Sequence, residues 1–348
     1  MAADFSHPHA AHMRLLAFGP DDAEELTSWA DLVNAVSAAD APWSPPETPS
    51  SAEGYFRHGW DGEPDSPYLA LDGDRVVGWG AVAASDYDNL DLAWLHVAVH
   101  PAHRRRGLGS AILAGLLEEA VRRGRTSVGV DAWESEAADG FAARHGFERK
   151  HSAINRRQVL ADVDWAGLEK QYDEALPHAA DYVLERWPFP TPDERLEELA
   201  VMAASINDAP LGDLDYEDEV FTGERMRAYE VARSGRGQRM YRMMAIHRPS
   251  GELTAQTVVA VSGEDPTWAD QHDTSVVRSH RGHRLGLLLK TEMLRWLAEA
   301  EPRLQTIDTW NAESNQHMIG VNEVLGYRVL GRELAYQRSL RPAGSTQE

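Results

Sequence analysis

The sequence contains no cysteine among its 348 residues. This absence excludes disulfide bonds, thiolate metal ligands and a cysteine nucleophile together. The sequence also has no run of about 18 apolar residues, so no membrane-spanning helix is predicted. Its first residues lack the basic and apolar regions of a secretory signal. These absences favour a protein of the reducing cytoplasm.

Basic residues are scarce, and lysine most of all. Lys and Arg number 34 against 56 Asp and Glu, which gives a formal net charge of −22. Such a chain is poorly suited to neutralising phosphates, so we expect neither a nucleic acid nor an anionic membrane as a partner. The charge is compatible with a cationic or amine-bearing partner. Alternatively, it serves only to keep the protein in solution.

An internal repeat divides the chain. Residues 97–124 and 274–301 each read as a short β-branched run, a polar His/Arg turn and a helix. His103 corresponds to His280 and Gly109 to Gly286, in both cases 177 positions apart. A later Gly-aromatic pair recurs after 180 positions. This spacing is too long for a solenoid and indicates two copies of one domain.

Hydrophobic periodicity and turn signals predict the same order of elements in both halves. In the first half we expect strands at 13–18, 68–71, 76–83, 93–99 and 126–132, and helices at 22–37, from about 52, 108–123 and 136–145. In the second half we expect strands at 181–187, 240–247, 253–261, 274–277 and 305–310, and helices at 192–206, 222–233, 285–300 and 315–325. The fold class is therefore α+β (mixed α/β), with a mostly antiparallel sheet flanked by helices in each half.

The predicted organisation has five segments. They are a flexible leader at 1–12, an N-terminal domain at 13–161, a linker at 162–177, a C-terminal domain at 178–340 and a flexible tail at 341–348. The leader contains His7, His9 and His12, but no acidic neighbours support them as a metal site, so no metal is predicted.

One motif carries the chemistry. Between a predicted strand and a predicted helix, the chain reads Arg104-Arg105-Arg106-Gly107-Leu108-Gly109. Glycines there allow close approach of the backbone to a ligand, and the helix N-terminus offers free N–H groups to an anion. The motif therefore favours a pyrophosphate site; the alternative is a tight turn with a solvated basic face.

These residues resemble the signature of the GNAT acyltransferase superfamily, Arg/Gln-x-x-Gly-x-Gly/Ala. The resemblance covers nearly the whole chain as two tandem copies, as in tandem acetyltransferases of actinobacteria. It implies two GNAT folds and acetyl-CoA as the co-substrate. It also implies that the loop amides hold the CoA pyrophosphate and that the preceding strand splays at His96–Val99 to receive the pantetheine. The residues implied to bind CoA are Val97, Ala98, Val99, Arg104, Arg105, Arg106, Gly107, Leu108, Gly109 and Ser110.

The second copy departs from this signature, because Arg284 stands where the first copy has Gly107. Its side chain would either crowd the pyrophosphate or pair with it. CoA binding is therefore expected first of all in the N-terminal half. The second-copy candidates are Val276, Arg281, Gly282, His283, Arg284, Leu285, Gly286, Asn311 and Asn315, of which the two asparagines alternatively cap the last helix.

The resemblance also implies an acid and a base. The family's tyrosine acid is replaced by Ala142 in the first copy and by Asn322 in the second. Candidates for the base that takes the ammonium proton are His96, Asp131 and Glu134, with Asp273, Asn311 and Glu313 as counterparts. The leading catalytic candidates are His96, Glu134 and Asp273, each with the alternative of a structural or solvated role.

An acidic loop is the candidate acceptor site. Residues 207–219 hold six acids and no basic residue, where the fold would place one wall of the acceptor pocket. This predicts a cationic acceptor, with Asp213, Asp215 and Glu217 as substrate-binding candidates; the alternative is a solvated loop. The equivalent segment of the first copy, residues 42–49, is rich in proline.

Three hypotheses about function follow. The first is transfer of an acetyl group from acetyl-CoA to a primary amine of a small, cationic molecule by direct attack in a ternary complex. The second is acetylation of protein lysines or N-termini. The third is a non-catalytic CoA-binding sensor or scaffold with degenerate sites, which Ala142 and Asn322 would allow. We expect a monomer or a homodimer.

Overall fold

A computed structural model describes residues 12–341 of the chain. The predicted leader (1–12) and tail (341–348), including His7 and His9, lie almost entirely outside the described residues. Within the described range, no helix combines the length and the apolar character needed to cross a lipid bilayer.

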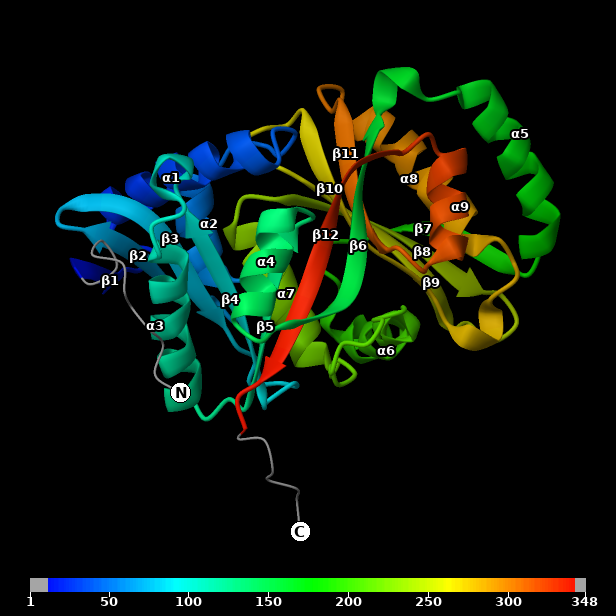
Figure 1. Ribbon diagram of the computed structural model, residues 1–348. Coiled ribbons are helices and arrows are strands. Elements are labelled where there is room, and N and C mark those ends of the chain that lie inside the picture. The colour runs from blue at the N-terminus through cyan, green and yellow to red at the C-terminus, as the bar shows by residue number, and fades with distance from the viewer. Residues whose placement is uncertain (1–11, 342–348) are drawn as a thin grey trace, which may run out of the picture.

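The two halves repeat one order of elements (Figure 1). The first half contains β1 (Met13–Ala17), α1 (Ala23–Asp40), α2 (Pro49–His58), β2 (Ser66–Asp72), β3 (Arg75–Ala83), β4 (Leu92–Val99), α3 (Leu108–Arg122), β5 (Ser127–Trp133), α4 (Glu136–Arg144) and β6 (Glu148–Val159). After α5 (Trp165–Ala175), the second half contains β7 (Tyr182–Trp187), α6 (Leu196–Ala203), α7 (Gly223–Gly235), β8 (Arg239–His247), β9 (Leu253–Val261), β10 (Trp268–Val276), α8 (Leu285–Ala300), β11 (Thr306–Ala312), α9 (Gln316–Val324) and β12 (Arg328–Ser339). The predicted α+β class and the mostly antiparallel sheet are confirmed.

The two halves share one continuous sheet by exchanging their last strands. The strand order is β1-β2-β3-β4-β5-β12-β6-β11-β10-β9-β8-β7. The C-terminal strand β12 therefore pairs with β5 of the first half, and β6 pairs with β11 of the second. Figure 1 shows β12 in red and β6 in green side by side in the middle of the molecule. The last strand of each half thus completes the sheet of the other.

Both exchanged strands were missed by the sequence analysis, and their composition explains why. The strand β6 reads ERKHSAINRRQV, without the apolar alternation of an ordinary half-buried strand. Two of its polar side chains bind partners from the second half. Arg157 forms a bidentate ion pair with Asp308 of β11, at 2.6 and 2.7 Å, and Gln158 donates to the Leu325 carbonyl at 2.6 Å. Burial of β6 therefore depends on long-range pairing.

Helices cover both faces of the sheet. Successive residues of a strand point to opposite faces, so neighbours on β3 contact different helices. Gly78 faces α3, where an added Cβ would lie 2.8 Å from Ile112, and the next residue, Trp79, packs on Trp29 of α1 with ring centroids 5.4 Å apart. The glycine thus permits the close approach of α3, the helix that follows the Gly-rich loop.

Two main hydrophobic clusters form the core, one in each half. Leu334 and Tyr336 of β12 belong to the cluster of the first half, although they lie near the end of the chain. The predicted linker, 162–177, contains α5, whose Leu168 is buried in the cluster of the second half. The domain ranges 13–161 and 178–340 remain a proposal, and each contains one strand that is hydrogen-bonded into the other half.

Truncation of Leu334 tests the exchange. Its side chain is fully buried, and we expect Leu334→Ala to lower the free energy of unfolding by about 2–5 kcal/mol, the usual range for such a cavity. Val329, on the same strand but 61% exposed, provides the matched control, and Val329→Ala should cost well under 1 kcal/mol. Denaturant unfolding measures both; equal effects would contradict the burial of β12 in the first-half core.

Candidate active site

The strands β4 and β5 separate in the middle of the first half. They pair in parallel only from Leu92 to Leu95, opposite Ser127–Val130. Beyond that point His96–Val99 continue to pair with β3 on the other side. Among the described residues, the backbone of this segment therefore has no β partner on the side facing β5. The arrangement agrees with the splay expected at His96–Val99, next to the Gly-rich loop. In the second half, β10 and β11 likewise pair only over Trp268–Gln271.

The Gly-rich loops of the two halves have positive φ values at the same two positions, but the order of arginine and glycine at these positions is reversed. In the first loop Arg105 and Gly107 have positive φ values of 64° and 81°. In the second loop the corresponding positions are Gly282 and Arg284, with φ values of 87° and 55°. Each loop thus holds one glycine and one strained arginine in the left-handed region. Arg284 therefore does not distort the second loop.

Each loop presents a row of unused backbone donors. In the described part of the chain, no acceptor meets the N–H groups of residues 105–110 or of residues 282–287. Neither α3 nor α8, which begin in these loops, has a side-chain cap at its N-terminus. Free N–H groups at the positive end of a helix dipole favour an anion, so both loops have the backbone for a phosphate site.

The first arginine of each loop holds the loop in place. Arg104 donates from Nε to the Val99 carbonyl at 3.1 Å and binds both carboxylate oxygens of Asp40 at 2.8 and 2.6 Å. Arg281 repeats this with the Val276 carbonyl at 3.1 Å and Asp208 at 2.6 Å. These guanidinium groups are already paired. Their contribution is to position the loop against the preceding strand and the end of a helix.

A group of ionisable side chains lies where β4 and β5 separate. His96 Nε2 lies 3.4 Å from Asp65 Oδ2, which also accepts a hydrogen bond from Tyr55 at 2.7 Å. Although burial disfavours the charged imidazole, the hydrogen bond and the charge of Asp65 raise the pKa of His96. Burial alone would raise the pKa of Asp65, but the hydrogen bonds from His96 and Tyr55 lower it. His96 and Asp65 thus form an ion pair over a wider pH range than usual.

Two further carboxyl groups face this pair. Asp131 of β5 accepts a hydrogen bond from the Trp94 indole. Desolvation by the surrounding atoms raises the pKa of its carboxyl group, although the residue is exposed to solvent. Glu333 of β12 lies diagonally across the strand pair, since Asp131 pairs with Ala335. Burial and the charge of Asp131 raise the pKa of Glu333 to about 8. Two perturbed, accessible acids beside an imidazole mark a candidate catalytic site.

The structure brings together the sequence candidates His96 and Asp131 and adds Glu333 and Asp65. Nothing in the sequence marked Glu333, because it lies on the exchanged strand, 202 positions after Asp131. Asp65 lies just before β2, in a segment that reads as an ordinary turn. Only the strand order places these side chains beside one another.

The catalytic candidate Glu134 is occupied elsewhere. Arg332 of β12 binds both of its oxygens at 2.9 and 3.0 Å and also binds Glu313 at 2.6 Å. One arginine of the exchanged strand therefore bridges the two glutamates that sequence comparison treated as counterparts. Both carboxylate oxygens of Glu134 are therefore already engaged by a guanidinium.

The counterpart site of the second half is filled by protein side chains. At a β-bulge between Gln271 and Thr274, the candidate Asp273 adjoins His272, whose Nδ1 lies 2.6 Å from the Tyr229 hydroxyl. Burial and nearby arginines lower the pKa of His272 well below its usual value, and burial raises the pKa of Asp273. Arg233, which is 1% exposed, stacks 3.5 Å from the ring centre of Trp60, and that ring also contacts His272.

Asn311 and Asn315 are also engaged within the second half. Asn315 accepts from the Met318 N–H at 3.2 Å and caps α9, the alternative foreseen from the sequence. Asn311 accepts from Asn322, which in turn accepts from Lys290 at 2.8 Å. Asn322, at the position of the family's acid, is fully buried and bonded on both sides.

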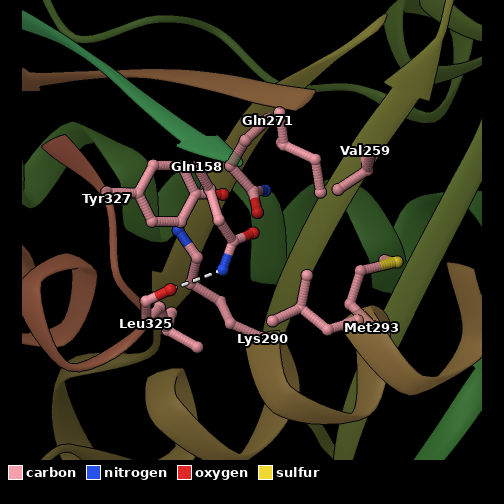
Figure 2. Close-up of a pocket in the computed structure, with 9 residues that line it drawn as sticks. Gln158, Val259, Gln271, Lys290, Met293, Leu325 and Tyr327 are labelled. Atoms are coloured by element: carbon pink, nitrogen blue, oxygen red, sulfur yellow. Dashed lines mark hydrogen bonds between the residues drawn. The ribbon is translucent and has the colours of Figure 1, made fainter. Parts of the chain in front are cut away.

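Lys290 lies in the core of the second half, where Figure 2 shows it among apolar and amide side chains. It lies 4.8 Å from the ring centre of Tyr327, and the surrounding packing leaves no room for a water molecule. Burial lowers the pKa of Lys290 to about 7. The closed chain from Lys290 to Asn311 therefore stabilises α8 and α9 rather than facing a substrate.

The acidic loop of the second half docks on the first half. The N–H groups of the three substrate candidates are bound by the first half and by the exchanged strand β12: Asp213 by the Lys150 carbonyl at 2.9 Å, Glu217 by Asn89 Oδ1 at 2.7 Å and Asp215 by Gln337 Oε1 of β12 at 2.7 Å. Between them, burial and nearby acids that include Asp131 raise the pKa of Tyr216 to about 12. The loop therefore borders the acids of the first half.

The left-handed loop positions give a stability prediction. Gly107→Ala adds a Cβ at a φ of 81°, and we expect it to lower the free energy of unfolding by about 1 kcal/mol. The matched change Arg284→Gly removes a side chain from the same position of the second loop and should leave stability unchanged or raise it. Thermal unfolding measures both. An equal loss in both variants would show that conformation does not govern these positions.

Comparison with protein families finds one match in the first half. Residues 30–147 match the model of the acetyltransferase (GNAT) family, a range that includes the Gly-rich loop and α4. A mycothiol acetyltransferase of Parafrankia sp. (strain EAN1pec) is 24% identical over 283 residues, covering 78% of this chain and 83% of that protein.

Solved structures resemble the whole chain. A tandem GNAT protein from the clavulanic acid biosynthesis pathway is 27% identical with a TM-score of 0.78, covering 95% of this chain and 99% of that one. A GCN5-related N-acetyltransferase from Sphaerobacter thermophilus shares the fold at 16% identity, with a TM-score of 0.65 and coverage of 95% and 96%. These similarities extend over both halves.

Proposed function

This chain belongs to the GNAT acetyltransferase family as a tandem of two such domains, and we propose that it transfers an acetyl group from acetyl-CoA to a primary amine of a small, cationic molecule. The observation that carries the proposal is the position of Asp131 and Glu333. These two accessible acids lie where β4 and β5 separate, beside the strand that leads to the Gly-rich loop.

The first half is the donor site in this proposal. Its loop offers six unpaired N–H groups to a pyrophosphate, and His96–Val99 offer unpaired strand backbone to the pantetheine. The paired arginine Arg104 keeps the loop in register with that strand. The corresponding loop of the second half has the same backbone conformation. The strand that precedes it is instead packed against the side chains of Arg233 and Trp60 at His272.

The acceptor amine would lie beside the acids. Asp65, Asp131 and Glu333 give this site three carboxyl groups against one imidazole, and the docked acidic loop adds negative charge at its edge. This field favours a cationic ligand. A bound ammonium would also lower the pKa values of Asp131 and Glu333, because an opposite charge favours the ionised carboxylate.

The reaction needs one proton to move before the amine can attack. Acetyl-CoA supplies an acetyl group on a thioester, whose thiolate is a fair leaving group with a pKa of about 8.5. The carboxylate pair of Asp131 and Glu333 takes the ammonium proton, and the new N–C bond forms as the C–S bond breaks. The second nitrogen proton passes to the departing thiolate, which leaves as the free thiol of CoA. The charge of His96 opposes the rise in the pKa values of both carboxyl groups and so favours their ionised form. No covalent enzyme intermediate is required, because the amine attacks directly.

Gly107 tests the donor site. Gly107→Val places a branched side chain at a φ of 81° in the loop, and we expect acetyl-CoA to bind at least about tenfold more weakly. Gly282→Val, at a φ of 87° in the other loop, provides the matched control and should leave the affinity unchanged. Isothermal titration calorimetry measures both. Loss of binding only in Gly282→Val would move the donor site to the second half.

Glu333 tests the base. Because a base acts only when ionised, kcat/KM should rise with pH through the Glu333 pKa near 8. Glu333→Gln should lower kcat by roughly 10²–10⁴-fold and remove that limb of the profile. Glu134→Gln changes the glutamate that is paired with Arg332 and is the control. It should retain kcat and the same pH dependence.

Thiol release with a panel of amines provides the assay for these variants. An unchanged pH limb in Glu333→Gln would exclude the glutamate as the base. Tight CoA binding without thiol release on any amine or peptide would instead favour a non-catalytic sensor.

A further inference from the structure

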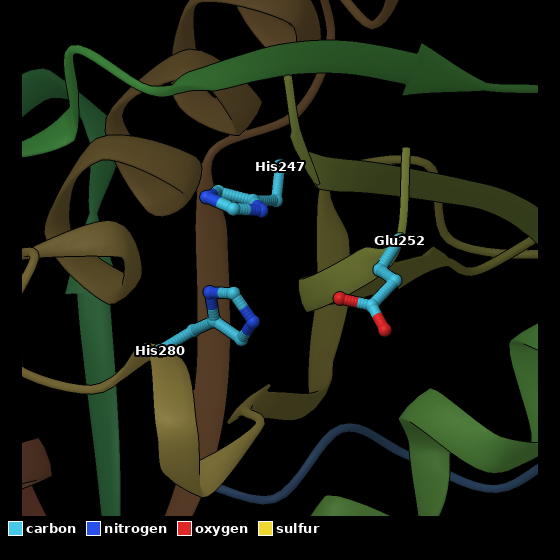
Figure 3. Close-up of side chains that lie close together, drawn as sticks. All are labelled: His247, Glu252 and His280. Atoms are coloured by element: carbon cyan, nitrogen blue, oxygen red, sulfur yellow. The ribbon is translucent and has the colours of Figure 1, made fainter. Parts of the chain in front are cut away.

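The second half gathers imidazoles behind its Gly-rich loop. His247 ends β8 and Glu252 follows it across a tight turn, while His280 ends the short helix Arg278–His280 that precedes the loop. One ligating atom from each of these three side chains lies within 4.8 Å of the other two. Figure 3 shows the two imidazoles one above the other, with the Glu252 carboxylate turned towards them.

The partners of these side chains leave their ligating atoms free. Ser250 Oγ donates to Glu252 at 2.8 Å and therefore accepts from His247 Nδ1, also at 2.8 Å. His247 then carries its proton on Nδ1, and Nε2 retains its lone pair. His280 Nδ1 lies 2.8 Å from the Tyr182 hydroxyl. In the tautomer that donates from Nδ1 to this hydroxyl, Nε2 of His280 is free to bind a metal. Hydrogen bonding through Nδ1 is how proteins orient metal-binding histidines.

We propose that His247, Glu252 and His280 bind a divalent transition-metal ion of the Zn²⁺ class. Two imidazole nitrogens and one carboxylate oxygen form a ligand set that suits this class and leaves a fourth position for water. The site is independent of the proposed acetyl transfer, and its ligands come from the β8–β9 hairpin and the helix before Arg281. A bound ion would therefore tie the hairpin to the Gly-rich loop of the second half.

The neighbouring His283 provides an internal control. It lies close to the same Tyr182, with ring centroids 5.2 Å apart, but its Nδ1 contacts the His178 carbonyl at 2.8 Å. It is absent from the converging group of ligating atoms. Removing His283 should therefore leave metal binding intact. If any nearby imidazole could bind the metal, removing His283 would weaken binding as much as removing His247 or His280.

The test uses the full, untagged chain after treatment with EDTA. Co²⁺ is the probe for visible absorption and Zn²⁺ the probe for calorimetry and thermal unfolding. We expect one tight equivalent of metal, d–d absorption bands with Co²⁺ and a rise in Tm with Zn²⁺. The double variant His247→Ala/His280→Ala should lose all three.

Milder single variants distinguish loss of the metal site from misfolding of the double variant. Glu252→Gln preserves the side-chain shape and should weaken Zn²⁺ binding, and Ser250→Ala should weaken it roughly 10–100-fold by releasing His247. His283→Ala should bind as the unmodified chain does. The proposal is overturned if the Co²⁺ bands persist in the double variant, or if Zn²⁺ affinity is the same in all variants.

Discussion

The pairing of β12 with β5, and of β6 with β11, is the constraint on which the rest of the molecule depends. It converts two similar halves into one continuous sheet and places Leu334 and Tyr336 of β12 in the core of the first half. It also delivers the side chains of β12 to the first half. Glu333 joins the ionisable group beside His96, and Arg332 bridges Glu134 and Glu313.

The two halves have kept one backbone and diverged in chemistry. Both Gly-rich loops use two left-handed residues, and in both an arginine ties the loop to the preceding strand. Beyond the loops the halves differ. In the first half, the two strands separate next to ionisable carboxyl groups. In the second half, they separate next to the side chain of Arg233, which stacks on Trp60. Duplication of a fold therefore does not duplicate its site, because the loop backbone and the surrounding side chains vary independently.

The negative charge of the sequence has a specific distribution. Backbone N–H groups fix the acidic loop at 207–219 to the first half and to β12. At the start of the loop the charge of Asp208 is paired with Arg281, so the later acids of the loop contribute the negative charge. Together with Asp131 and Glu333 it concentrates acids near the separation of β4 and β5. Crowded like charges raise one another's pKa values and favour a bound cation, which links the overall charge to the proposed acceptor.

The sequence by itself determined the repeat, the α+β class and the position of the Gly-rich loop, because periodicity and turn chemistry are local. The candidates His96 and Asp131 came from the resemblance to a family. It missed β6 and β12, whose polar residues hide their burial, and with them Glu333 and the occupied state of Glu134. No motif marked the tryptophan cluster either, in which the ring centroid of Trp133 lies 5.2 Å from that of Trp43 and 5.4 Å from that of Trp310. Only the tertiary structure decided these points, because pairing between strands far apart in sequence leaves no local signature.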